Sequence, residues 1–261
     1  MTEPDLYALM REYIPEELHA DFERMIRKGL RLRHAQDGDE IIGYFGGLPE
    51  LPAGFTWPES DRYPCEHVAT IDLATLPTTD LNLPTSGRIS IFGDTRGQGG
   101  AFHYFPTEMP TREATPPPAL VAEDRIFKRV PMAYAVVPTI PSITWMHEHL
   151  LEQGDYEDQV HKQFDALGSV HFRHSWSWHQ LGGCANEIQG ANDRVVLPGS
   201  PAEQHFCPDG SPSGQILIAQ FDTDNEIGMG WGDFGTLYCF IDPKDLATNN
   251  FADVNVYWDC Y

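Results

Sequence analysis

The spacing of hydrophobic residues divides the chain into helical and strand-like stretches. Over residues 15–32 apolar positions recur at helical spacing, which predicts an N-terminal helix. A second helical zone covers residues 142–167. Ser142 is placed to cap one helix, Asp155 to cap the next, and Gly168 to end it. Elsewhere short apolar runs alternate with polar residues and are cut by Gly and Pro, as in β-strands joined by turns.

These elements are ordered as runs of strands with a few helices, not as an alternation of strands and helices. The expected fold class is therefore α+β, with a β-rich core of mainly antiparallel strands. We expect an N-terminal helical segment over residues 1–40. One α+β domain, with a central helical segment, is expected over residues 41–261.

Two stretches of the expected domain resemble each other. "ATIDL", a loop and "SGRISIF" recur as "AQFDT", a loop and "FGTLYCF". In each stretch an Asp lies before a Gly, by 15 residues in the first and 13 in the second, and a Gly-Gly pair precedes both. The marker residues are Gly46, Gly47, Asp72 and Gly87, and then Gly182, Gly183, Asp222 and Gly235. This repeated order predicts an internal duplication, with units around 41–92 and 179–241.

The charge of the chain narrows the choice of partners. Its 261 residues contain 17 Lys and Arg against 39 Asp and Glu, a formal net charge of −22. Five of the bases lie in residues 24–34, so the rest of the chain carries 12 bases against 39 acids. Such a surface repels phosphate backbones and anionic membranes. We expect a basic protein partner, no nucleic acid and no membrane, whereas the sequence does not indicate the oligomeric state.

Cysteine usage and the N-terminus indicate the compartment. The five cysteines are widely spaced and form no CxxC pair, which fits neither a disulfide framework nor a zinc ribbon. The N-terminus lacks the basic and apolar regions of a secretory signal, and no apolar run approaches the ~18 residues of a membrane span. We therefore expect a reduced, cytoplasmic protein.

The stretch "FDTDNEIGMGWGDFG" raises the question of a calcium site. Four acids hold positions 1, 3, 5 and 12 of an EF-hand loop, namely Asp222, Asp224, Glu226 and Asp233. However, Ile227 stands where an EF-hand needs Gly, and the flanking sequences are strands. We expect no metal and no cofactor here. An acidic loop should instead lead into a turn in which Trp231 packs and Asp233 bonds backbone amides.

The segment "HSWSWHQLGG" is the strongest candidate for ligand binding. In an extended chain its two tryptophans share one face, and they can stack on a sugar or a peptide or form half of a sandwich core. The core is the favoured interpretation because large aromatic residues are mostly buried. The alternative site is a cleft near His179–Gln189 and Trp231–Asp233. Its candidate residues are Trp176, Trp178, His179, Gln180, Gln189, Trp231 and Asp233.

Motifs for catalysis are missing from the sequence. There is no GxSxG elbow, no P-loop and no HExxH helix. Cys184 follows a Gly-Gly pair near His179, but a small core cysteine is favoured over a nucleophile. We assign no catalytic residues, and a non-enzymatic protein is favoured over an enzyme.

Five segments resemble the YwqG-like family, a group of mainly bacterial proteins of largely unknown function. They are, in order, "GGLPELPAGFTWP", "ATIDLATLP", "LPTSGRISIF", "HQLGGCANEIQG" and "WGDFGTLYCFI". The resemblance implies an α+β fold with an internally repeated β-rich core, and it supplies no catalytic residues. Cys184 and Ala185 replace the aromatic-Pro pair expected after the glycines. Some relatives occur beside toxin systems and are regarded as immunity proteins, which implies binding.

Two functions from different classes follow from these observations. The favoured one is a non-enzymatic cytoplasmic binding protein whose acidic surface takes a basic protein partner, as an immunity protein takes its toxin. The alternative is a small-molecule, sugar or metal-dependent ligand-binding protein or enzyme that uses the cleft near His179–Gln189 and Trp231–Asp233.

Overall fold

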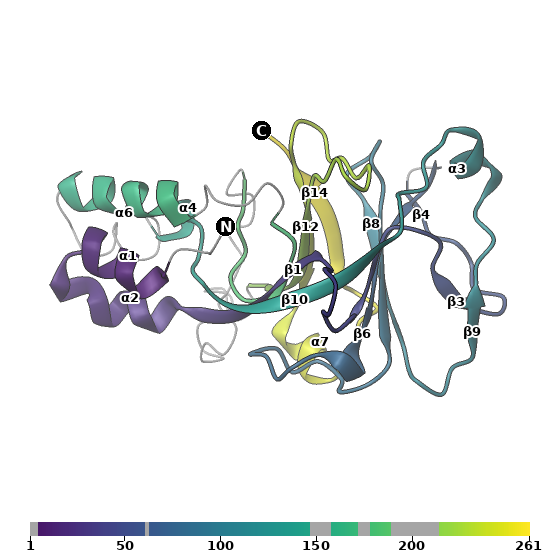
Figure 1. Ribbon diagram of the computed structural model, residues 1–261, viewed down its shortest axis with the longest axis horizontal. Helices are drawn as coiled ribbons and strands as arrows, with labels where there is room; N and C mark the ends of the chain where they lie inside the picture. The colour runs from purple at the N-terminus through teal and green to yellow at the C-terminus, as the bar shows by residue number, and fades with distance from the viewer. Residues whose placement is uncertain (1–4, 61–62, 147–157, 172–177, 189–213) are drawn as a thin grey trace, which may run out of the picture.

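A ten-stranded sheet dominates the structure, and a cluster of helices lies at one end of it (Figure 1). The computed structural model describes residues 5–60, 63–146, 158–171, 178–188 and 214–261. All neighbouring strands of the large sheet are antiparallel. In spatial order they are β14 (Asn255–Asp259), β13 (Thr236–Ile241), β12 (Ile216–Asp222), β11 (Gln180–Gly182), β1 (Arg27–His34), β10 (Val130–Thr139), β2 (Gly43–Phe45), β6 (Glu66–Asp72), β7 (Arg88–Gly93) and β8 (Gly100–Phe105). The outermost strands β8 and β14 contact each other, so the sheet nearly closes on itself.

Two small sheets and several helices make up the other elements of the described residues. Two small sheets pair β3 (Glu50–Pro52) with β9 (Thr111–Glu113) and β4 (Glu59–Ser60) with β5 (Tyr63–Pro64). The helices are α1 (Leu6–Tyr13), η1 (Glu16–Leu18), α2 (His19–Met25), η2 (Leu73–Thr75), α3 (Pro118–Ala122), α4 (Ile143–Met146), α6 (Asp158–His171) and α7 (Pro243–Ala247). The predicted α+β class, with a β-rich core of mainly antiparallel strands, is confirmed.

The predicted N-terminal helix is wrong beyond Met25. Residues 27–34 form β1, which lies in the middle of the large sheet between β11 and β10. Leu30 and Leu32 are buried in the core, an alternation that suits a strand and would point to different faces of a helix. The pairing of residues 27–34 with β10 and β11 thus overrides the helical spacing that continues from α2. The division into residues 1–40 and 41–261 stays a prediction.

A helical cluster packs α1, α2, α4 and α6 together, on the left in Figure 1. The rings of Phe22 and Phe164 meet edge to face at 6.1 Å between centroids. The prediction that Gly168 ends its helix is wrong, because α6 continues to His171. A Cβ atom on Gly168 would lie 2.2 Å from Ile143 Cγ1, so the glycine permits α4 and α6 to approach closely. Asp155, the expected cap, lies outside the described residues.

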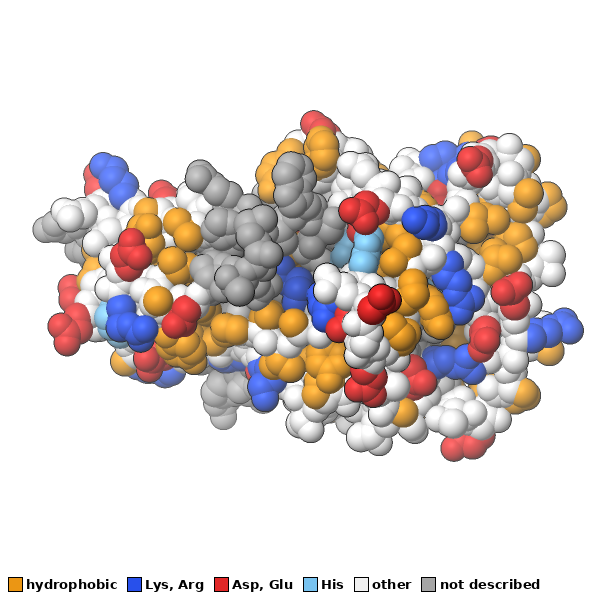
Figure 2. Space-filling view, viewed as in Figure 1, with side chains coloured by type: hydrophobic (Ala, Val, Ile, Leu, Met, Phe, Trp, Pro, Cys, Tyr) orange, Lys and Arg blue, Asp and Glu red, His pale blue; other side chains and the backbone are white. Residues whose placement is uncertain are grey.

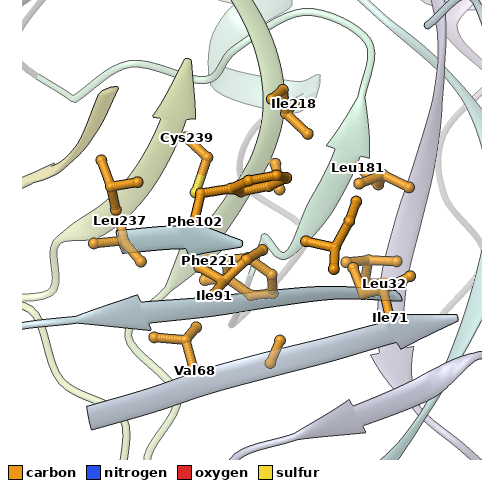
Figure 3. Packing of buried hydrophobic residues seen from close by; sticks show 14 of the residues in the cluster. Leu32, Val68, Ile71, Ile91, Phe102, Leu181, Ile218, Phe221, Leu237 and Cys239 are labelled. Atoms are coloured by element: carbon orange, nitrogen blue, oxygen red, sulfur yellow. The ribbon is translucent and has the colours of Figure 1, made fainter. Parts of the chain in front are cut away.

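The main core fills the inner face of the large sheet (Figure 3). In Figure 3 side chains from both halves of the sheet point toward one another: Leu32, Val68, Ile71, Ile91, Phe102, Leu181, Ile218, Phe221, Leu237 and Cys239. Each fully buried side chain of this size contributes about 1.5–3 kcal/mol. β-Bulges interrupt the alternation in β6 between His67 and Ala69 and in β12 between Leu217 and Ala219. Each bulge therefore puts two consecutive residues into the core.

We predict that Gly235→Ala destabilises the protein by about 1–3 kcal/mol or more, through overpacking. The new Cβ would lie 2.2 Å from the Asp259 backbone oxygen and 2.4 Å from that of Trp231, and neither backbone can move independently. Urea unfolding measures the loss. Gly230→Ala, in the same loop, is the control: its Cβ would meet no atom within 4 Å, so stability should change by less than about 0.5 kcal/mol. Equal stability of the two variants would contradict this packing.

Candidate functional site

The candidate residues of the "HSWSWHQLGG" segment lie where β11 runs beside the end of β12. Trp178, His179 and Gln180 are buried there. Trp176 and Gln189 lie outside the described residues. The described part of the candidate site is therefore built from Trp178 to Gln180 and from the β12–β13 loop.

Trp178 and Gln180 are occupied by contacts within the chain. The Trp178 indole N–H donates to Gln180 Oε1 at 2.8 Å. The guanidinium carbon of Arg31 lies 3.3 Å from the centre of the Trp178 ring, which closes that face. Gln180 Nε2 donates to the backbone oxygens of Gly182 and Cys184 at 2.7 and 2.9 Å. Trp178 is thus buried as the core interpretation predicts, and its covered face offers no open stacking platform.

His179 is held from both ring nitrogens. Its Nδ1 accepts the backbone N–H of Asp222 at 3.2 Å, so the ring hydrogen sits on Nε2 and is donated to Asp224 Oδ2, also at 3.2 Å. The ring packs against Phe45 and Phe221, with centroids 4.8 and 5.9 Å away. These contacts fix both the orientation and the tautomer of His179.

Asp224 joins His179 to a second histidine from β1. His34 Nε2 donates to Asp224 Oδ2 at 2.8 Å, and the Glu226 amide donates to Oδ1 at 2.9 Å. Burial raises the pKa of Asp224, but the hydrogen bond and charge of His179, the Glu226 amide and the charge of His34 outweigh it and lower the pKa to about 2. The cluster reaches solvent through His34 and the exposed Glu226, 3.3 Å apart. Figure 2 shows histidine atoms at the surface of this face, beside acidic and basic side chains.

Asp222 takes a different role two residues earlier. It accepts the Trp178 amide at 2.6 Å and the Thr236 hydroxyl at 2.8 Å, and so ties β12 to its neighbours. Burial is the largest influence on this carboxyl and raises its pKa. The loop acids therefore serve as hydrogen-bond acceptors for the chain itself. His34 was missed by the sequence analysis because it lies 190 residues from Asp224.

The turn after this loop separates a buried aromatic residue from an exposed one. Trp231 is fully buried, as predicted, and its backbone N–H donates to Thr223 Oγ1 at 3.1 Å. The prediction that the Asp233 carboxylate bonds backbone amides differs from the structure. The carboxylates that accept backbone amides here are those of Asp222, from Trp178, and Asp224, from Glu226. Asp233 itself is exposed, and its backbone oxygen accepts the Tyr261 N–H at 3.2 Å.

Phe234 is the unusual residue of this turn. It has a left-handed backbone with φ of 52°, and 68% of the residue is exposed. Tyr261, whose amide bonds the same turn, is 80% exposed. The turn closes by a 2.7 Å hydrogen bond from Gly235 N to Trp231 O, so Phe234 is held outward on a fixed backbone. The sequence analysis singled out the turn but not this residue.

A model of one protein family matches residues 44–260, and its description is a domain of unknown function, DUF1963. The chain belongs to the DUF1963 family. The match begins in β2 and ends just after β14, so it includes the acidic loop and the Phe234 turn but not the central strand β1. No curated protein matches the chain.

The described residues of this DUF1963 chain show the following for metal ligands, for Cys184 and for membrane-spanning helices. Within the described ranges, no group of three or more His, Cys, Asp or Glu side chains could hold a metal ion. Burial raises the pKa of the Cys184 thiol to about 12, which keeps it protonated and unreactive near neutral pH. In the part of the chain that the structure describes, no helix is both long and apolar enough to cross a membrane.

We predict that Asp224→Asn destabilises this DUF1963 protein by about 1–3 kcal/mol at pH 7, because the amide leaves the N–H groups of buried His179 and half-buried His34 without a charged acceptor. Asp233→Asn, an exposed change in the same loop, is the control and should stay within about 0.5 kcal/mol. Urea unfolding measures both.

The pH dependence of this effect has a defined sign. Because the pKa of folded Asp224 is depressed to about 2, its charge stabilises the fold above the unfolded pKa of about 3.9, and this contribution is lost as the pH falls toward 2. The stability difference between wild type and Asp224→Asn should therefore shrink between pH 4 and 2. A difference that stays constant over this interval would argue against the assigned role.

Proposed function

We propose that this DUF1963 protein is a non-enzymatic binding protein that takes a basic protein partner on an acidic surface. The centre of this surface, called here the Phe234 surface, consists of Asp233, Phe234, Asp259 and Tyr261. Phe234 carries the proposal. A left-handed backbone costs a bulky residue about 1–3 kcal/mol, and exposing its ring gains nothing in the isolated protein. A partner that covers the ring accounts for both features.

The charge around this surface favours a basic partner. From residue 185 to the end, the chain has 12 acids against Arg194 and Lys244. Among the described residues, no Lys or Arg lies within ion-pair distance of Asp233 or Asp259. Lys and Arg side chains of a partner would form ion pairs with Asp233 and Asp259 and would stack on the exposed rings of Phe234 and Tyr261.

A cytoplasmic, immunity-like role is the more specific form of the proposal. Cys65, Cys184 and Cys239 are buried free thiols, in keeping with a reducing compartment. The resemblance to the YwqG-like family, some of whose members are regarded as immunity proteins, makes a basic toxin one form of such a partner. Capture from the cytosol of the source cells tests this form, and an acidic protein or a nucleic acid as the captured partner would contradict it.

We also propose that the sheet arose by internal duplication. Strands β2, β6, β7 and β8 follow the same spatial order outward as β11, β12, β13 and β14. The bulges of β6 and β12 precede Ala69 and Ala219, and both Gly-Gly pairs have left-handed backbones. The two central strands, β1 and β10, are exchanged between the repeats. β1 precedes β2 in the chain but pairs with β11, and β10 precedes β11 but pairs with β2. Comparing residues 43–105 with 180–259 across many family members should give similarity above chance; none would speak against duplication.

We predict that Asp233→Lys slows association with the captured basic partner several-fold at low salt and changes dissociation much less. Long-range attraction steers encounter, and the Debye length falls from ~10 Å at 0.1 M salt to ~3 Å at 1 M. Asp253→Lys makes the same charge change before the opposite end of β14 and should slow association less. Surface plasmon resonance measures both rates. Association that is indifferent to salt would overturn the steering argument.

The exposed ring allows a separate test in two parts. Phe234→Ala should weaken binding of that partner about 10–100-fold, mainly through faster dissociation, as for an interface hot spot. Val136→Ala, which truncates a residue that is 51% exposed on β10, should leave binding unchanged.

Phe234→Gly reports on the backbone strain in the free protein. Glycine adopts the left-handed conformation without steric cost, so urea stability should not fall and should rise by up to about 1 kcal/mol. Partner binding should be lost in the same variant. Strong destabilisation would mean that the ring serves the fold rather than an interface.

A further inference from the structure

The large sheet has a first half, β2, β6, β7 and β8, and a second half, β11 to β14. The outer face is covered by the chain in the second half and open in the first. In the second half, residues 183–188 return over the strands. The Asn186 N–H donates to Gln220 Oε1 at 3.0 Å, and the Tyr238 hydroxyl donates to the Asn186 oxygen at 2.9 Å. In the second half, Gln180 of β11 pairs with Gln220 of β12. In the first half, Tyr44 of β2 pairs with Thr70 of β6. Over Tyr44 and Thr70 lies a cavity of about 280 Å³.

The cavity has one arginine that the chain leaves free for a ligand. The Arg129 guanidinium lies 3.9 Å from the centre of the Tyr44 ring, and among the described residues no carboxylate lies within ion-pair distance of it. The second lining arginine, Arg88, forms an ion pair with Glu50 and donates to Thr111 Oγ1 at 2.6 Å. In a chain with 39 acids against 17 bases, an unpaired arginine beside a cavity points to an anionic group on the ligand.

Other residues of the cavity lining present hydrogen-bond acceptors. Buried His67 donates from Nδ1 to the backbone oxygens of Gly46 and Gly47, both at 3.1 Å, so its Nε2 accepts the Thr70 hydroxyl at 2.9 Å. Burial lowers the pKa of His67 to about 4, so this direction of the hydrogen bond holds at neutral pH. Thr70 donates its only hydroxyl hydrogen to His67, so its oxygen accepts the Ser90 hydroxyl at 3.3 Å and keeps one lone pair for the cavity. Asp72 adds a carboxylate to the lining.

We propose that this cavity binds a small zwitterion of the amino-acid class, with its carboxylate on Arg129 and its ammonium group on Asp72 and the Thr70 oxygen. Asp72 and Glu50 would repel a ligand with several negative charges. A ligand with one carboxylate and one ammonium group instead has a charge of opposite sign in the lining for each of its two groups. Leu48 and Ile41 supply an apolar lining for a side chain. The volume of about 280 Å³ lies just below the ~300–1,000 Å³ typical of ligand pockets, which suits a small metabolite. This proposal is independent of the Phe234 surface.

Calorimetry on the full chain tests the proposal with the twenty amino acids, and with leucine as the reference for an apolar side chain. We expect saturable one-to-one binding of at least one amino acid. For that ligand, the analogue without a carboxylate and the analogue without an amine should bind at least ten-fold more weakly; for leucine these are leucinamide and 4-methylpentanoate. Absence of binding by all twenty, or equal binding of either analogue, would overturn the proposal.

Two arginine variants connect the binding to the cavity. Arg129→Gln should weaken binding of the amino acid at least ten-fold and remove its advantage over the carboxylate-free analogue. Arg24→Gln, a matched change on α2 at a side chain that is 75% exposed, should leave binding unaltered. Thr70→Val removes the hydroxyl, and in the folded variant it should weaken binding about ten-fold. Unchanged affinity in Arg129→Gln would show that the ligand binds elsewhere.

Discussion

The pairing of β1 with β10 is the interaction on which the rest of the structure depends. Eight residue pairs, from Arg27 with Thr139 to His34 with Met132, join strands that lie about a hundred residues apart in the chain. β11 extends the sheet from β1, and β2 extends it from β10, so both halves depend on this central pair. The helical cluster continues from the same end, where Met25 precedes β1 and Ile140 follows β10. Closing so long a loop has an entropic cost, which the buried core of both halves must offset.

The alternation of side chains along these strands separates the core from the functional surface. Inward residues form one continuous core across both halves, whereas the outward residues meet different surroundings. In the second half, the segment that carries Cys184 and Asn186 satisfies the outward polar groups. In the first half, Tyr44, Thr70 and Asp72 face a cavity instead. The sequence predicts a ligand-binding cleft near His179, whereas the open cavity of the structure lies beside His67.

Acidic residues serve two purposes in the β12–β13 loop. Asp222 and Asp224 are turned inward, and their half-buried hydrogen bonds hold β1, the residues just before β11, and β13 in place. Asp233 is turned outward beside Phe234, where it is available to a partner. The spacing that resembles a calcium loop is explained by these inward bonds, and the hydrogen bond from Gly235 N to Trp231 O holds the turn that follows.

The sequence by itself determined the β-rich antiparallel fold, the burial of Trp231 and the acidic character of the surface. These follow from local alternation, from turn residues such as Gly235 and from composition, and none of them needs a distant partner. Only the tertiary structure decided that residues 27–34 are a strand, that His34 meets Asp224, and which half of the sheet keeps its outer face open. Each of these depends on contacts between residues far apart in the chain, such as the 190 residues between His34 and Asp224. Such contacts leave no periodic signal, because they form only when the whole sheet brings the two segments together.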